Sequence, residues 1–569
     1  MKKSNLFVIL SVVLLTMVSC KIPKEFIEGV VVNPSPVEYH NGEVIFNMEG
    51  TFPEKYFAKN IKIRVTPVIT SSNGEVFRAD SKTFQGEKIK GNNEEVLYKI
   101  GGKYSQKAVF DYKVGMDSSI ISVEAEVITN KGKVIALPPV ELAKGVVITP
   151  LLVSSKTNTG DLCNLVAKDK FQRIIEEKTD AQINFLINRS DIRYSERKKD
   201  ELVELTKTIK AAKEDEKREF VGIEINSYAS PDGELEFNEK LSDRRSNVAE
   251  KYINREIKKL KAEISIDSKF TAEDWAGFQE LVEKSDISDK AVILRVLSMY
   301  TDSEQREKEI KNLSVAYKAI ADDILPELRR SKMSLKVNVI GKSDEEISEL
   351  VKTDIKQLNL EEILYAATLV EGDEEKINIY LSASELFPAD YRSYNNIGNI
   401  YLNQGKKHDA SRFLLKAYEI NPNDPIVNFN CGLMKLSYLN LEDAKVFFGN
   451  AGGVGEPLNA ALGTIEIIEG NYKKAVSLLS KTVSNNAALA NVLNKNYQEA
   501  NNILNKVEEP IATTYYLKAI VAARTNDVEN LVSNLKIAIE KDAKYKEKAP
   551  RDMEFINYFE NELFIEAIK

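Results

Sequence analysis

The sequence predicts a multidomain chain of three successive modules: an N-terminal β-sandwich, a central α+β domain and a C-terminal all-α repeat solenoid. Residues 27–150 hold short alternating apolar runs divided by Gly, Asn and Pro. Residues 165–345 mix strand-like and helix-like periods, and from residue 357 onward a helical pattern recurs. The length of 569 residues also favours about three domains.

The first 19 residues are predicted to be a lipoprotein signal peptide, outside the fold. Two lysines, Lys2 and Lys3, precede an apolar run at residues 6–18, which is too short for a membrane span and typical of a signal core. The run ends in Met-Val-Ser-Cys, which resembles a bacterial lipobox. The resemblance implies that Cys20 is lipidated after export, so that a lipid anchor holds the mature chain in a membrane.

The composition argues against several classes of function. The net charge of −8 gives no reason to expect nucleic acid as a partner. Apart from Cys20, the cysteines are Cys163 and Cys431, far apart, and the histidines are His40 and His408. We therefore expect no metal site, no cofactor and no histidine-based triad. Pairs of acidic residues are the remaining route to catalysis, and the chain is expected not to be an enzyme.

Residues 27–150 are predicted to form the β-sandwich. Alternating runs at 42–52, 60–70, 107–116 and 119–129 are rich in β-branched and aromatic residues, with no helical period between them. The connection Asn130–Lys133 is predicted to be a hairpin turn. No pattern in this module suggests catalysis, so spacing or docking is its expected role.

Residues 165–345 are predicted to be an α+β domain. Val221, Ile223 and Ile225 alternate as a half-buried strand, and the small polar residues at 230–233 then form a turn before a helix that starts near residue 234. Further elements are expected as strands at 182–186, 262–266 and 334–340, a helix at 196–212 and a helical insertion at about 272–330.

The turn and helix of this domain carry a resemblance to a known family. The spacing resembles the OmpA-like, peptidoglycan-associated domain at Gly233, Asn238, Leu241, Ser242 and Arg245. The loop Tyr-Ala-Ser-Pro-Asp-Gly is similar to that of OmpA-related proteins of the Bacteroidetes envelope. The resemblance implies peptidoglycan binding, with Arg245 matching the family's ligand-binding Arg. Ser230 stands where the family has its ligand-binding Asp.

The candidate peptidoglycan-binding residues are therefore Ser230, Asp232, Asn238 and Arg245. A diaminopimelate end offers an ammonium and a carboxylate, which a carboxylate and a guanidinium would bind. Serine cannot pair with an ammonium, so Asp232 either replaces the missing carboxylate or caps the helix. Arg245 either binds the ligand or lies with Arg244 on a solvated helix face. Asn238 is expected to fix the loop through hydrogen bonds to the backbone.

Residues 357–569 are predicted to be a helical repeat solenoid, with residues 551–569 as its cap. The clearest unit, residues 391–424, resembles the tetratricopeptide repeat at Tyr394, Ile397, Gly398, Tyr401, Ala410, Leu414, Ala417 and Pro422. Gly398 and Ala410 are small, so that paired helices can approach. Cys431 falls in the next unit at a position expected to be buried. The groove of such a superhelix typically takes a peptide or a helix from a protein partner.

Two hypotheses follow for the whole chain. In the first, it is a non-catalytic, lipid-anchored scaffold of the outer membrane that faces the periplasm, contacts peptidoglycan and recruits a protein through its repeats. The periplasmic face is favoured because residues 21–25 lack an acidic run. In the second, Ser230 marks the loss of peptidoglycan binding, and the protein is a docking component of a surface fimbrial or secretion apparatus.

Overall fold

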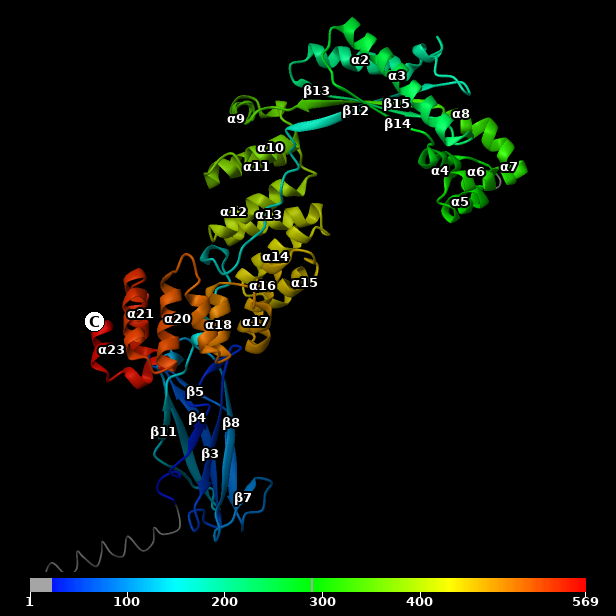
Figure 1. The fold of residues 1–569 in the computed structure, drawn as a ribbon. Helices are drawn as coiled ribbons and strands as arrows, with labels where there is room; N and C mark the ends of the chain where they lie inside the picture. Colours follow the sequence, from blue (N-terminus) through cyan, green and yellow to red (C-terminus); the bar gives the residue numbers. More distant parts are fainter. Residues whose placement is uncertain (1–22, 288–289) are drawn as a thin grey trace, which may run out of the picture. The chain divides into compact units, whose positions relative to one another are not determined.

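The computed structural model describes residues 23–287 and 290–569 and divides them into two compact units (Figure 1). One unit joins the described residues up to Lys168 to Val370–Lys569, and the other is Asp169–Leu369. The predicted signal peptide and Cys20 lie outside the described residues. Among the residues that are described, every helix is too short or too polar to cross a membrane.

The N-terminal part of the first unit is a β module with two sheets around one core. Sheet one has the order β1-β3-β2 with β8 beside β3, and sheet two has the order β10-β9-β4-β6-β7 with β11 and β5 added to β9 and β4. The strands are β1 (Val31–Asn33), β2 (Tyr39–His40), β3 (Glu43–Phe52), β4 (Ile61–Thr70), β5 (Val76–Arg78), β6 (Lys82–Gly86), β7 (Glu94–Val96), β8 (Gly102–Asp111), β9 (Ile120–Thr129), β10 (Val134–Ala136) and β11 (Val140–Lys144).

The predicted β-rich N-terminal region is thus confirmed. Phe46 and Phe52 of one sheet and Ile63 and Phe84 of the other lie in the same buried cluster, because alternate residues of each strand face inward. The predicted turn joins β9 to β10 as an antiparallel hairpin, with Gly132 at a φ of 80°.

The second unit is an α+β layer built on a sheet of order β12-β15-β13-β14. The pair β13–β14 is parallel and the other pairs are antiparallel. Its strands are β12 (Ile174–Asn184), β13 (Arg218–Tyr228), β14 (Ile266–Thr271) and β15 (Arg330–Ile340). Apolar residues of α2 (Asp200–Glu214) and α3 (Leu235–Leu260) share one buried cluster with those of the sheet.

Three strands of this unit differ from their predicted bounds, and the one expected at 334–340 begins earlier, at Arg330. The strand expected at 262–266 begins instead at Ile266, because α3 runs on to Leu260 and ends at Lys261 in the left-handed region with φ 52°. The strand expected at 182–186 runs from Ile174 to Asn184 and pairs with β15 over its whole length. The predicted helical insertion lies between β14 and β15, as α4 (Trp275–Lys284), α5 (Lys290–Met299), α6 (Ser303–Asn312), α7 (Ser314–Ala319), a π-helical turn (Ile320–Ile324) and α8 (Leu325–Leu328).

The helices α9 (Asp344–Thr353) and α10 (Leu360–Ala366) complete this second unit, and the repeats of the first unit follow. The repeat helices are α11 (Asp373–Leu386), α12 (Tyr391–Asn403), α13 (Lys407–Ile420), α14 (Pro425–Ser437), α15 (Leu441–Gly449), α16 (Glu456–Ile468), α17 (Tyr472–Leu478), α18 (Asn485–Leu493), α19 (Tyr497–Leu504), α20 (Ala512–Arg524) and α21 (Val528–Lys541). The segments α22 (Lys544–Lys548), a 3-10 helix (Met553–Tyr558) and α23 (Glu562–Ala567) close the stack.

Small residues let the paired repeat helices approach, as predicted. A Cβ added to Gly398 would lie 2.6 Å from Leu414 Cγ, and one on Gly432 would lie 2.4 Å from Phe448 Cε1. Cys431, next to Gly432, is fully buried, and burial raises the pKa of its thiol to about 12. Its expected place as a small residue of the repeat core is confirmed by this burial.

A buried ion pair ties the C-terminal cap to the last repeat. Arg524 of α20 donates from Nε to Glu554 Oε2 over 2.8 Å and from Nη2 to Glu554 Oε1 over 2.5 Å. Burial opposes the charge of Arg524, but the hydrogen bond and the attraction of Glu554 outweigh it and raise the Arg524 pKa. Glu554 also accepts a hydrogen bond from Thr149 Oγ1, where the chain leaves the β module.

We expect Glu554→Gln to lower the free energy of unfolding of the first unit by about 2 kcal/mol, because the Arg524 charge stays buried without a counter-charge. Urea denaturation followed by far-UV circular dichroism measures this loss. The control is Glu419→Gln, whose pair with Lys416 is exposed and should contribute less than about 1 kcal/mol. Equal losses in the two variants would contradict this account of the cap.

Candidate functional site

Residues 149–168, called the strap below, leave the β module and run along the repeat helices (Figure 1). They belong to the same compact unit as the repeats. Apart from two short 3-10 turns, Thr149–Leu152 and Thr157–Thr159, the strap has no regular secondary structure. Its backbone N–H and C=O groups therefore need partners outside the strap.

Three buried asparagines of the repeats supply these partners. Asn396 of α12 accepts from Ala167 N over 2.9 Å and donates to Ala167 O over 3.0 Å. Asn430 of α14 binds Leu165 N and O in the same way, at 3.0 and 2.7 Å. Asn486 of α18 binds Ser154 N and O at 2.9 and 2.8 Å. Each side-chain amide thus forms hydrogen bonds with both the N–H and the C=O of one strap residue, as a neighbouring β-strand would.

The three asparagines occupy one position of the repeat. Asn396 and Asn430 stand two residues before the packing glycines Gly398 and Gly432, and Asn486 stands two residues before Ala488, the matching small residue of α18. In α16 the matching residue is Ala461, which has no amide. The helical repeat therefore sets where the backbone can be bound.

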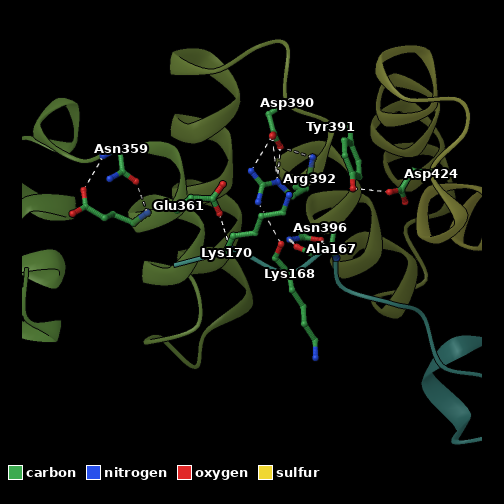
Figure 2. A network of polar contacts seen from close by, with 11 residues as sticks. Ala167, Lys168, Lys170, Asn359, Glu361, Asp390, Tyr391, Arg392, Asn396 and Asp424 are labelled. Atoms are coloured by element: carbon green, nitrogen blue, oxygen red, sulfur yellow. Dashed lines mark hydrogen bonds and ion pairs between the residues drawn. The ribbon is translucent and has the colours of Figure 1, made fainter. Parts of the chain in front are cut away.

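Further polar contacts gather at the end of the strap (Figure 2). Asn395 and Asn399 also donate to the carbonyl of Leu165. Figure 2 shows Asn396 against Ala167, and Arg392 between Asp390 and the carbonyl of Lys168. Arg392 donates to Lys168 O over 3.4 Å, and the Asp390 carboxylate holds its guanidinium at 3.0 Å. The hydrogen bonds to residues 165, 167 and 168 are all to backbone atoms.

The middle of the strap is fixed by a carboxylate. Asp161 is buried, and its Oδ1 accepts from Asn486 N over 2.8 Å in the first turn of α18. A negative charge is favourable at the N-terminus of a helix. Burial raises the pKa of Asp161, and the hydrogen bonds from Asn486 and Thr159 oppose that rise.

Apolar side chains of the strap alternate between buried and exposed near its end. Leu162 and Ala167 are buried, with Ala167 only 2% exposed, and Leu165 packs partly against the repeat core. Val166, between them, is 51% exposed. The site therefore accepts an extended backbone, with a small side chain at residue 167 and almost any side chain at residue 166.

The sequence-predicted residue Arg245 lies in the second unit, buried in α3 and 1% exposed. Its Nη1 donates to Tyr228 O over 2.8 Å, its Nε to Arg189 O over 3.0 Å and its Nη2 to Leu186 O over 3.2 Å. Burial lowers the pKa of this guanidinium to about 10. Arg245 thus ties the β13 end and the segment after β12 to the helix.

The other three predicted residues surround the loop before α3. Asn238 Nδ2 donates to Ser230 O over 3.1 Å and to Gly233 O over 3.0 Å, which confirms that it fixes the loop. Asp232 does not cap the helix, because the N-cap residue is Glu234 and no side chain caps it. Asp232 Oδ2 lies 3.4 Å from Arg329 Nη2, and Arg329 Nε donates to Ser230 Oγ over 3.2 Å.

We expect Arg245→Ala to lower the free energy of unfolding of the second unit by about 3 kcal/mol, because a large buried side chain is lost and three partly buried carbonyls lose their donor. The sole tryptophan, Trp275, lies in this unit, so its fluorescence during urea denaturation reports the loss. Its neighbour Arg244 is the matched control, since it makes one exposed hydrogen bond to Lys240 O. A loss in Arg244→Ala as large as that in Arg245→Ala would argue against the buried role.

Sequence reasoning missed Arg329 and the asparagines. Arg329 comes about a hundred residues after the loop, beyond the helical insertion, and no local pattern connects the two. The asparagines did carry a signal, because Asn396 and Asn430 recur at the repeat length. Within the described residues, His, Cys, Asp and Glu form no group of three or more that could hold a metal ion.

Comparisons with known proteins match the repeat region. The family model for the tetratricopeptide repeat matches residues 391–424. A solved tetratricopeptide repeat protein from Parabacteroides merdae ATCC 43184 is 18% identical, covering 49% of this chain and 99% of its own, with a TM-score of 0.27. The peptide-binding repeat protein YrrB is 20% identical, covering 30% and 97%, with a TM-score of 0.23.

Yeast Tom70 is 11% identical, covering 57% of this chain and 77% of its own, with a TM-score of 0.25. Comparison with curated proteins gives no match. The family model covers one repeat unit, so it describes the repeats and not the other modules. Residues 391–424 are therefore a tetratricopeptide repeat within a C-terminal region of paired helices, and a repeat of this kind suggests a scaffold for protein–protein interaction.

Proposed function

We propose that this protein is a non-catalytic scaffold that binds protein segments by their backbone in the groove of its repeats. The supporting observation is the set Asn396, Asn430 and Asn486, each of which binds both the N–H and the C=O of one residue. Backbone groups are common to all peptides, so such a groove suits extended segments of other proteins as well as the strap.

The test is co-purification of a partner from cells that produce the full-length protein. The double variant Asn396→Ala/Asn430→Ala should lose the partner that the natural chain retains. The control is Asn502→Ala, an exposed asparagine of α19 whose side chain donates a hydrogen bond to Glu499. Retention of the same partner by the double variant would overturn groove binding.

The proposal includes a lipid anchor at Cys20, in the outer membrane and on its periplasmic face, as the signal sequence suggests. Growth with an alkyne-bearing fatty acid should label the protein, and Cys20→Ser should abolish the label. Protease added to intact cells should leave the protein whole, and cleavage should require a permeabilised outer membrane. Cleavage in intact cells would favour the surface-exposed alternative.

For the second unit we propose an OmpA-like module that docks protein and has lost peptidoglycan binding. The support is that Arg245 donates to three backbone carbonyls and that Asp232 pairs with Arg329. Both ligand-type groups of the predicted site thus have partners inside the chain. A ligand would have to break these contacts before binding.

We therefore expect the mature protein to stay in the supernatant when it is sedimented with purified peptidoglycan. Breaking the internal pair with Arg329→Ala tests whether a latent site remains, since Asp232 would then keep the hydrogen bond from Ser230 Oγ but lose its ion pair. Sedimentation of the natural protein that disappears in Asp232→Ala would contradict the proposed loss and restore the wall-binding hypothesis.

A further inference from the structure

We propose that the end of the strap, residues 164–168, is a built-in competitor that occupies the partner site, and that a partner inserts an extended Leu-x-Ala-like segment in its place. The inference rests on the proposed groove function and names the ligand of that site. The occupant to which it commits is a segment of a different protein with an apolar residue and, two places later, a small one.

The first support is the kind of contact that holds this end. Leu165 and Ala167 are bound through their N–H and C=O groups, and Lys168 through its C=O. An extended segment of another protein presents the same groups at the same spacing. The advantages of the strap here are the two side-chain hydrogen bonds of Asn164 and its covalent attachment, which raises its effective concentration.

The second support is the shape of the site, which defines the ligand. Ala167 is 2% exposed, so the residue bound by Asn396 must be small. Leu165 packs partly on the repeat core, so the residue bound by Asn430 is best apolar. Val166 is 51% exposed, so the residue between them is unrestricted. Together these requirements give the pattern apolar-x-small.

The third support is that the strap leaves one groove group unused. Asn399 Nδ2 donates to Leu165 O, but its buried Oδ1 has no hydrogen-bond partner among the described residues. A buried acceptor without a donor is unfavourable. A ligand that presents one more donor at this place would be held better than the strap.

The two ends of the strap are held differently, which points to where exchange takes place. Residues 149–162 are fixed by side chains as well as backbone: Thr149 donates to Glu554, Asp161 accepts from the Asn486 amide of α18, and Leu162 is buried. The end at 164–168 relies on backbone contacts, on the fit of Ala167 and on Asn164 Nδ2, which donates to Asn399 O over 2.9 Å and to Asn403 Oδ1 over 3.0 Å. Unlike the segment with Asp161, this end buries no charged side chain, so it is the part that a partner displaces while the rest stays on the repeats.

The test uses the full chain and a fluorescent peptide of residues 162–170 with serine in place of Cys163. Ala167→Arg should eject the strap end and leave the asparagines in place. We expect this variant to bind the peptide at least 10-fold more tightly than the natural chain in fluorescence anisotropy. The control Val166→Arg adds the same charge at an exposed position and should bind as the natural chain does.

Adding Asn430→Ala to Ala167→Arg should abolish peptide binding, and a peptide with tryptophan at position 167 should not bind. Equal binding to Ala167→Arg and the natural chain overturns the inference. So does a dimer of Ala167→Arg in light scattering, since a second copy would then be the occupant. If the peptide binds but no partner co-purifies from cells, the result supports the strap end as a competitor for this site and contradicts the proposed scaffold function.

A second measurement on the natural chain covers the case in which Ala167→Arg does not fold. Excess peptide should speed hydrogen exchange of the Leu165 and Ala167 amides at least 10-fold, because the strap end leaves the groove. The Asn486 amide, bound by Asp161, should keep its rate. Unchanged exchange at residues 165 and 167 in saturating peptide would show that the site is closed to partners.

Discussion

Gly432→Val should lower the free energy of unfolding of the repeat region by about 4 kcal/mol or more. Even a single Cβ at residue 432 would lie 2.4, 2.5 and 3.0 Å from three atoms of the Phe448 ring, closer than carbon atoms approach. Phe448 is buried between paired helices, so the ring cannot move aside. Overpacking by a methylene costs about 1–3 kcal/mol, and valine adds three carbon atoms.

The matched control is Gly449→Val at the end of α15. A Cβ there would meet no atom within 4 Å, so the substitution should change stability by less than about 1 kcal/mol. Urea denaturation followed by far-UV circular dichroism measures both variants. If Gly432→Val is as stable as Gly449→Val, the close approach of α14 and α15 is not required for the repeat.

Asn396→Ala/Asn430→Ala should release the end of the strap. The double variant removes four hydrogen bonds to the backbone of Leu165 and Ala167, and each such bond contributes about 1 kcal/mol. The strap end would then open far more often. Trypsin should cleave after Lys168 at least about 10-fold faster than in the natural chain, since cleavage follows the open population.

Mass spectrometry of the products identifies the cleavage site, and circular dichroism verifies that the helices persist. Asn502→Ala is again the control, because it removes an asparagine from an exposed helix face. Cleavage after Lys168 at the natural rate in the double variant would mean that the asparagines do not hold the strap.

Local sequence patterns predicted the modules because each module has its own period: alternation in the strands and a 34-residue repeat in the helices. The alternation in β3 and β4 and the glycines at 398 and 432 are properties of neighbouring residues, so they can be recognised without the fold. The first half of β12 was missed because residues 176–180 are mostly charged and exposed, and only pairing with β15 makes them a strand.

The candidate sites were harder to predict because their contacts join distant residues. Asp232 pairs with Arg329, which follows the helical insertion in the sequence. Arg245 donates hydrogen bonds to the backbone carbonyls of Leu186, Arg189 and Tyr228. The sequence of the strap shows neither a helical nor a strand period that would predict its structure. Its place is decided by asparagines more than 200 residues away, which no propensity rule connects to it.

Hydrogen exchange at single-residue resolution over residues 164–168 of the natural chain tests most directly that the asparagines bind the strap by its backbone. The amides of Leu165 and Ala167 donate to Asn430 and Asn396, whereas the amide of Val166 has no acceptor among the described residues. The expected result is slow exchange at 165 and 167 with fast exchange at 166. Fast exchange at all three residues would contradict the account.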